Sequence, residues 1–220
     1  MAESALPVLP VAYAAGMAPQ RRRALVRRAQ LLAWAGLAWH LVEAAVAVVA
    51  GVVAGSVALI GFGADSLIEA GAGMVVIWLM AGERSSSDRA ERRAQQLVAA
   101  SFVVLAGYVV VEALRQLLGG HHPDPSWTGI ALAIVTLATM PPLAAAKRRV
   151  GRDLGSSATT SESRQTMLCA YLSAGLLVGL LANAALGWWW ADPVVALAIG
   201  AVAVREAREA WRGEACPCCA

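Results

Sequence analysis

Charged residues are scarce in this chain of 220 residues. Asp, Glu, Lys and Arg together make up 15% of the sequence, whereas hydrophobic residues make up 59%. A typical soluble domain has about 25% charged residues, and the mean hydropathy here is positive. The composition therefore excludes an ordinary soluble domain and predicts an integral membrane protein.

Cysteine is also scarce, with four residues in the chain. Cys169 lies alone in an apolar run, whereas Cys216, Cys218 and Cys219 are crowded near the C-terminus. This spacing excludes the disulfide framework of a small secreted protein and favours thiols in a reducing compartment. Closely spaced thiols can bind a soft metal ion, so segment 213–220 is predicted to be a cytoplasmic tail that either binds a metal or is an unstructured end.

The N-terminus does not have the pattern of a signal peptide. Its first 20 residues contain neither a basic start nor a long apolar run, and five arginines follow between positions 21 and 28. Residues 1–28 are therefore predicted to form a cytoplasmic tail.

The rest of the chain is divided into apolar runs of about the length that crosses a bilayer, which is roughly 20 residues. The expected fold is all-α and integral to the membrane, with six transmembrane helices over residues 29–212. Small residues around Gly55 predict a tight hairpin between the first two spans. The expected spans are 30–52, 56–80, 96–118, 127–146, 166–187 and 190–210.

The basic residues predict the orientation of these spans. If both termini lie on one side, the segments on that side hold 17 of the 18 Lys and Arg residues, and only Arg115 is on the other. By the positive-inside rule both termini are therefore cytoplasmic, in a multi-pass protein of the cell membrane. The formal net charge of +3 is explained by topology, so we expect the lipid bilayer and no nucleic acid as a partner.

Two carboxylates lie where the bilayer disfavours them. A charged side chain at the centre of a span costs about 2.5 to 3.5 kcal/mol, so it needs a partner or a function. Asp65 and Glu69 are four residues apart in the second expected span and share one helix face, where they could bind a common cation. The alternative is that one is neutral and the other bonds to a neighbouring helix.

Other polar residues within the spans are weaker signals. His40 and Glu43 are three residues apart and can satisfy each other without any ligand. Glu112 and Arg115 are expected to form an ordinary ion pair near the outer boundary. Cys169, considered alone, is more often a small buried hydrophobic residue than a ligand.

Several motifs resemble the cation diffusion facilitator family. Residues 55–59 (GSVAL) and 64–69 (ADSLIE) are similar to the family's second helix, in which an Asp-x-x-x-Asp pair binds zinc or a related ion. Residues 190–197 (WADPVVAL) look like the start of its sixth helix. Residues 162–169 (ESRQTMLC) lie where its fifth helix carries His-x-x-x-Asp. The resemblance covers roughly residues 28 to 210.

The resemblance implies a metal site formed by Asp65, Glu69, Cys169 and Gln165. Glu69 replaces the family's second aspartate, Gln165 its histidine and Cys169 its second-pair aspartate. A thiolate with two carboxylates still suits zinc, and water or His40 is the alternative to Gln165 as fourth ligand. Measured along their helices, Asp65 is about 14 Å and Cys169 about 27 Å from the outer ends. They can meet only if the fifth span is strongly tilted or projects beyond the membrane.

The expected function is that of a secondary transporter, not an enzyme. It would export a divalent transition metal, with zinc as the expected ion, in exchange for protons; the metal is the transported substrate and no cofactor is expected. The resemblance implies a homodimer, and a short form that ends where relatives begin a cytosolic domain. The alternative is a membrane accessory or metal-sensing protein that binds metal without moving it.

Overall fold

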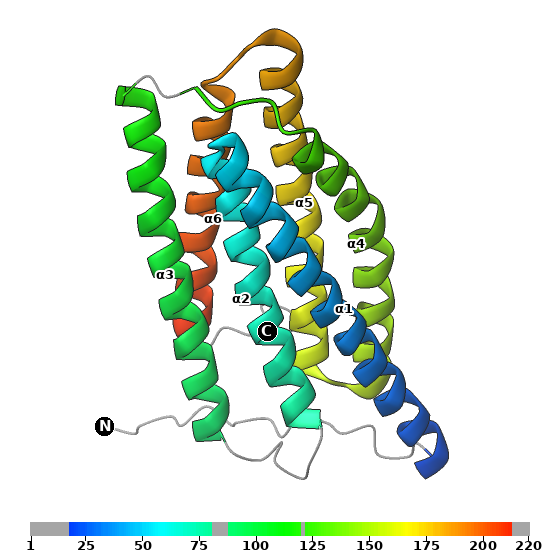
Figure 1. Cartoon of the computed structure of the whole chain (residues 1–220). Coiled ribbons are helices and arrows are strands. Elements are labelled where there is room, and N and C mark those ends of the chain that lie inside the picture. Colours follow the sequence, from blue (N-terminus) through cyan, green and yellow to red (C-terminus); the bar gives the residue numbers. More distant parts are fainter. Residues whose placement is uncertain (1–17, 81–87, 120–121, 213–220) are drawn as a thin grey trace, which may run out of the picture.

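The computed structural model describes residues 18–80, 88–119 and 122–212. These residues form six α-helices and no strand, which confirms the predicted all-helical fold (Figure 1). The predicted tail 213–220 and most of the predicted tail 1–28 lie outside the described residues. The helices are α1 (Pro19–Ala54), α2 (Val57–Met80), α3 (Asp88–Gly119), α4 (Trp127–Leu154), α5 (Ser157–Leu186) and α6 (Ala191–Arg212).

Four helices, α1, α3, α4 and α5, extend well beyond the apolar runs that predict them. α1 begins at Pro19 and includes the five arginines of the predicted tail, while α4 continues past residue 146 to Leu154. Because successive helices alternate in direction, α1, α3 and α5 begin at one end of the bundle, which we call the basic end. The turn between α1 and α2 lies at the opposite end (Figure 1).

The α1–α2 hairpin is as tight as predicted. Gly55 adopts a left-handed conformation with φ of 65° and ends α1, a geometry that glycine adopts without steric cost. Asp192, at the start of α6, then caps α2: its carboxylate accepts hydrogen bonds from the Ser56 hydroxyl and from the backbone N–H groups of Val57 (2.9 Å) and Ala58 (3.3 Å). The Asp-Pro motif thus joins α6 to the start of α2.

The helices pack mainly in the pairs α1–α2, α4–α5 and α3–α6. α2 also contacts α3, α5 and α6, so it lies within the bundle (Figure 1). Carboxylates on this helix can therefore face protein instead of lipid, as intramembrane charges do. Large apolar side chains such as Val53, Leu118 and Val178 are exposed on the outside, where lipid would cover them.

Four helices of the described chain are long and apolar enough to cross a membrane. The qualifying segments are Gln20–Ala54, Ala99–Gly119, Trp127–Leu154 and Glu162–Leu186. α6 carries Asp192 and the charged run from Arg205 to Glu209, and it packs against α3, α2 and α5. The number of helices matches the six predicted spans, and the cytoplasmic placement of the basic end stays a prediction.

Candidate intramembrane metal site

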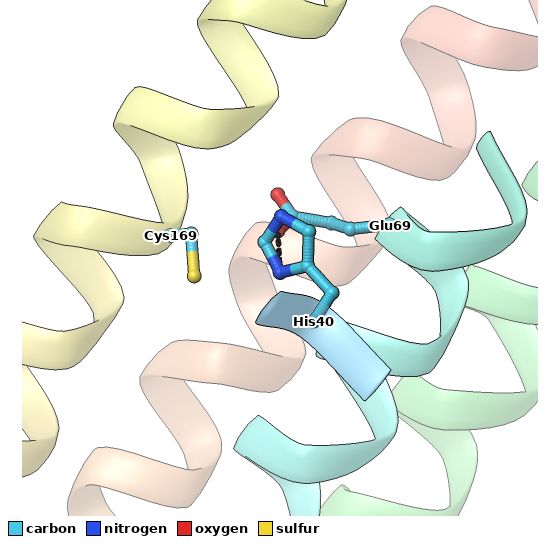
Figure 2. Close-up of side chains that lie close together, drawn as sticks. All are labelled: His40, Glu69 and Cys169. Atoms are coloured by element: carbon cyan, nitrogen blue, oxygen red, sulfur yellow. Dashed lines mark ion pairs between the residues drawn. The ribbon is translucent and has the colours of Figure 1, made fainter. Parts of the chain in front are cut away.

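Three potential metal ligands converge in the middle of the bundle. His40 of α1, Glu69 of α2 and Cys169 of α5 each offer one ligand atom, and these atoms lie within 4.8 Å of one another. In Figure 2 the Glu69 carboxylate and the His40 imidazole lie next to each other with the Cys169 thiol to one side, and each side chain projects from a different helix. All three residues are buried. The cluster therefore brings nitrogen, oxygen and sulfur donors together inside the protein.

The spacing of these atoms is close to that of a metal site. Zinc binds sulfur at about 2.3 Å and nitrogen or oxygen at about 2.0 to 2.2 Å, so donors in a tetrahedral site are roughly 3.3 to 3.8 Å apart. Movements of about 1 Å would bring the three donors to that separation. Mixed sulfur, nitrogen and oxygen ligands are those that zinc accepts.

One carboxylate oxygen of Glu69 has no hydrogen-bond partner in this arrangement. Its Oε2 atom is buried and accepts no hydrogen bond, although His40 Nδ1 is only 3.3 Å away. The distance is short enough for attraction, whereas the hydrogen-bond direction is not satisfied. Buried carboxylate oxygens are normally paired, so this atom is oriented for a partner such as a cation.

Glu43 is the fully satisfied neighbour of the cluster. Its carboxylate lies 3.2 Å from His40 Nδ1 and accepts hydrogen bonds from the hydroxyls of Ser66 (3.0 Å) and Thr136. The Cys169 thiol donates to it as well, at 3.7 Å. The predicted His40–Glu43 pair is confirmed. Glu43 thus fixes the orientation of the His40 ring, the usual second contact of a metal-binding histidine.

Of the four residues that the sequence predicts as metal ligands, three lie in the cluster or line the cavity beside it, and Asp65 does not. Glu69 and Cys169 meet, and Gln165 lines a small cavity together with His40 and Glu69. This cavity has room for about one water molecule or ion. Asp65 is buried one turn before Glu69, but it is not part of the three-residue cluster.

The position of α5 explains how Cys169 reaches Glu69. The end of α5 and the turn into α6 project beyond the α1–α2 turn (Figure 1). Cys169 can therefore be far from the end of its own helix and still be level with Glu69. Projection of the fifth helix beyond the membrane is one of the two arrangements that the sequence allows, and it stays a prediction.

Sequence reasoning missed a buried ion pair beside the cluster. Lys147 Nζ is 2.8 Å from Glu162 Oε1 and donates to the Thr166 hydroxyl at 3.2 Å. Both charged side chains are at most 8% exposed. The sequence assigned Lys147 to a cytoplasmic loop, because the apolar run of the fourth span ends at residue 146.

The predicted ion pair of Glu112 and Arg115 is present on α3, with a distance of 2.7 Å between Glu112 Oε1 and Arg115 Nη1 and with the Arg115 side chain 71% exposed.

Comparisons with known proteins show which proteins the chain is similar to. A family model described as the cation efflux transmembrane domain matches residues 33–212. An uncharacterized transporter of Synechocystis sp. is 28% identical over 156 residues, which cover 67% of this chain and 50% of the relative. The chain thus spans about half the length of the curated relative that it matches.

Six packed helices, with carboxylates, an imidazole and a thiol buried between them, define a multi-pass membrane protein with a polar site inside its bundle. The match over most of the length decides the family. The chain belongs to the cation efflux family, the cation diffusion facilitators. This is a family of cation transporters and not of enzymes.

Proposed function

We propose that this protein exports a divalent transition metal, zinc in the first place, in exchange for protons. The observation that carries the proposal is the convergence of His40, Glu69 and Cys169 from three helices, with their ligand atoms within 4.8 Å. Gln165 lines the adjoining cavity and supplies a further oxygen, or positions a water molecule that does. The metal is the transported substrate.

The donor set supports zinc over the abundant hard cations. Calcium and magnesium prefer six or more oxygen ligands, whereas this cluster offers one carboxylate with a nitrogen and a sulfur. Thiolate ligands favour zinc and softer ions. The zinc ion would reach the cluster from the basic end and leave toward the opposite end when the helices rearrange around it.

Proton exchange follows from the same ligands. A thiol, an imidazole and a carboxylate bind metal in their deprotonated forms, so metal binding releases protons and protonation favours metal release. The sequence departs from the family by placing glutamine at position 165, and His40 of α1 provides the imidazole that this position has lost.

The test is zinc flux into proteoliposomes that contain the purified protein and an indicator of zinc inside. Parent protein is expected to move zinc faster when the pH gradient drives protons the opposite way. Glu69→Gln is expected to abolish this flux, whereas Glu112→Gln, which removes an acid from a partly exposed pair, leaves it unchanged.

Tight zinc binding without flux in the parent would contradict transport and favour an accessory or sensing role. Flux that is equal in the parent and in Glu69→Gln would contradict the assigned site.

A further inference from the structure

The buried pair of Lys147 and Glu162 lies against the metal cluster. Both residues line the same small cavity as His40 and Glu69, together with Gln165. Thr166, which accepts a hydrogen bond from Lys147, lines it too. The cavity therefore has metal ligands on one side and an ion pair on the other.

The pair is on the side of the cluster nearer the basic end. Glu162 precedes Cys169 by seven residues, which is about 10 Å along α5. Lys147 lies seven residues before the end of α4 at Leu154, again about 10 Å from the helix end. An ion that reaches the cluster from the basic end along this cavity must pass between these two side chains.

The other side of the cluster is closed by apolar packing. Phe62 precedes Glu69 by two turns, and Leu176 follows Cys169 by two turns, so both lie toward the opposite end. Each is no more than 1% exposed. The buried polar residues Asp65 and Ser173 lie on that side as well, but the small cavity that adjoins the ligands is lined by Lys147 and Glu162. The ion pair thus closes this cavity on the side of the basic end.

The ion pair packs against two glycines of the neighbouring helices. A methyl group at Gly36 of α1 would lie 2.7 Å from Lys147 Nζ, and one at Gly73 of α2 would lie 3.6 Å from Glu162 Oε1. The ammonium therefore occupies the space that a side chain on α1 would fill. Helices α1 and α2 also carry the metal ligands His40 and Glu69, so the ion pair is wedged against both.

We infer that Lys147 and Glu162 form an electrostatic latch, which closes the metal site toward the basic end and opens when the ammonium leaves Glu162. The latch joins α4 to α5 and is separate from the metal ligands. Its role as a gate for an incoming divalent cation rests on the proposed function, whereas its closure of the cavity does not. Lys147 is a tethered cation that fills the approach in the absence of the transported one.

Cys169 offers a direct readout of this closure. It is fully buried in the cluster with His40 and Glu69, two residues that line the cavity, so a thiol reagent reaches it only when the protein opens around the cluster. Replacing Cys216, Cys218 and Cys219 by serine leaves Cys169 as the single thiol in the chain. The rate of its reaction with N-ethylmaleimide in detergent-solubilised protein, followed by mass spectrometry, then measures how often the site is open.

Three variants change the latch in different ways. Glu162→Gln removes the anion, and Gly36→Ala displaces the ammonium while every charge remains. Each is expected to raise the labelling rate about 10- to 100-fold, the range that corresponds to losing a charge-assisted hydrogen bond. The exchange of both charges, Lys147→Glu with Glu162→Lys, restores a pair and is expected to return the rate toward that of the parent.

Matched controls separate the latch from general loosening. Gly175→Ala adds a methyl group on α5 where nothing lies within 4 Å, and Arg205→Gln with Glu209→Gln removes an exposed pair of 2.8 Å on α6. Both should label at the parent rate. If Glu162→Gln does not fold, Gly36→Ala decides the matter, because its only close contacts are the flexible end of Lys147.

The outcomes distinguish the latch from the metal site. Labelling of Gly36→Ala at the parent rate would overturn the latch, and so would equal acceleration in the Gly175→Ala control. Zinc is expected to protect Cys169 from the reagent in the parent. Absence of that protection, with the latch variants still labelled faster, would overturn the proposed function and leave the latch standing.

Discussion

Glu43 is expected to control metal affinity without binding the metal. Its carboxylate contacts His40, Ser66, Thr136 and Cys169, which lie on four different helices. Glu43→Gln keeps the size of the side chain but turns one acceptor oxygen into an N–H donor, which faces groups that already donate. His40 and Cys169 would then lose the contact that orients them toward Glu69.

The expected loss follows from the number of contacts that are reversed. Removing the partner that orients a metal-binding histidine lowers affinity about 10- to 100-fold, which is about 1.4 to 2.8 kcal/mol. A buried donor left unpaired costs about 1 to 3 kcal/mol, so the upper part of this range is expected here. Because Glu43 is fully buried, solvent water cannot replace the lost contacts.

The assay is calorimetric titration of the detergent-solubilised protein with zinc. Glu43→Gln should bind the same number of ions as the parent with weaker affinity, since the three ligands remain. Glu112→Gln serves as the control, because its pair with Arg115 is on the surface. Zinc affinity within twofold of the parent would refute the idea that Glu43 orients the ligands, and loss of all binding sites would make Glu43 a ligand itself.

Three further predictions concern single residues. Asp65→Asn should weaken zinc binding less than Glu69→Gln, because Asp65 is not part of the cluster; an equal or larger loss in the same titration would place Asp65 among the ligands. Cys169→Ser should reduce affinity for cadmium more than for zinc, since sulfur favours the softer ion; equal losses in competition titrations would argue against a metal–sulfur bond. Asp192→Asn should lower the free energy of unfolding by about 2 kcal/mol, because the cap of α2 loses its charge; thermal unfolding unchanged from the parent would show that this cap adds little.

The sequence could predict the elements whose signals are local. Long apolar runs predict the six helices, the small residues around Gly55 predict the first hairpin, and the four-residue spacing of Asp65 and Glu69 indicates a functional face on α2. Each of these depends on residues that are close together in the chain. Composition and family motifs likewise suffice to predict a multi-pass transporter.

The parts that depend on how helices pack could not be predicted. Contact of His40 with Glu69 requires α1 and α2 to have a particular register, so the histidine was only an alternative to Gln165. Lys147 lies after the apolar run of α4, where topology alone explains a basic residue. Its burial results from the space that Gly36 leaves on a different helix, which periodicity does not reveal.

The cysteines at the C-terminus, Cys216, Cys218 and Cys219, lie outside the described residues. Their predicted role in metal binding therefore stays a prediction, as does the homodimer implied by the family. Light scattering of the purified protein in detergent would measure the mass of each particle and so test the homodimer. A mass of one chain per particle, after subtraction of the detergent, would contradict the dimer.

X-ray absorption of bound zinc tests the central claim, that His40, Glu69 and Cys169 hold the transported ion. The three C-terminal cysteines are first replaced by serine, so that sulfur can come only from Cys169. The account predicts one sulfur at about 2.3 Å, with nitrogen and oxygen neighbours at about 2.0 to 2.2 Å. It also predicts that Cys169→Ser removes the sulfur signal. A zinc site with nitrogen and oxygen neighbours alone in the parent would contradict it.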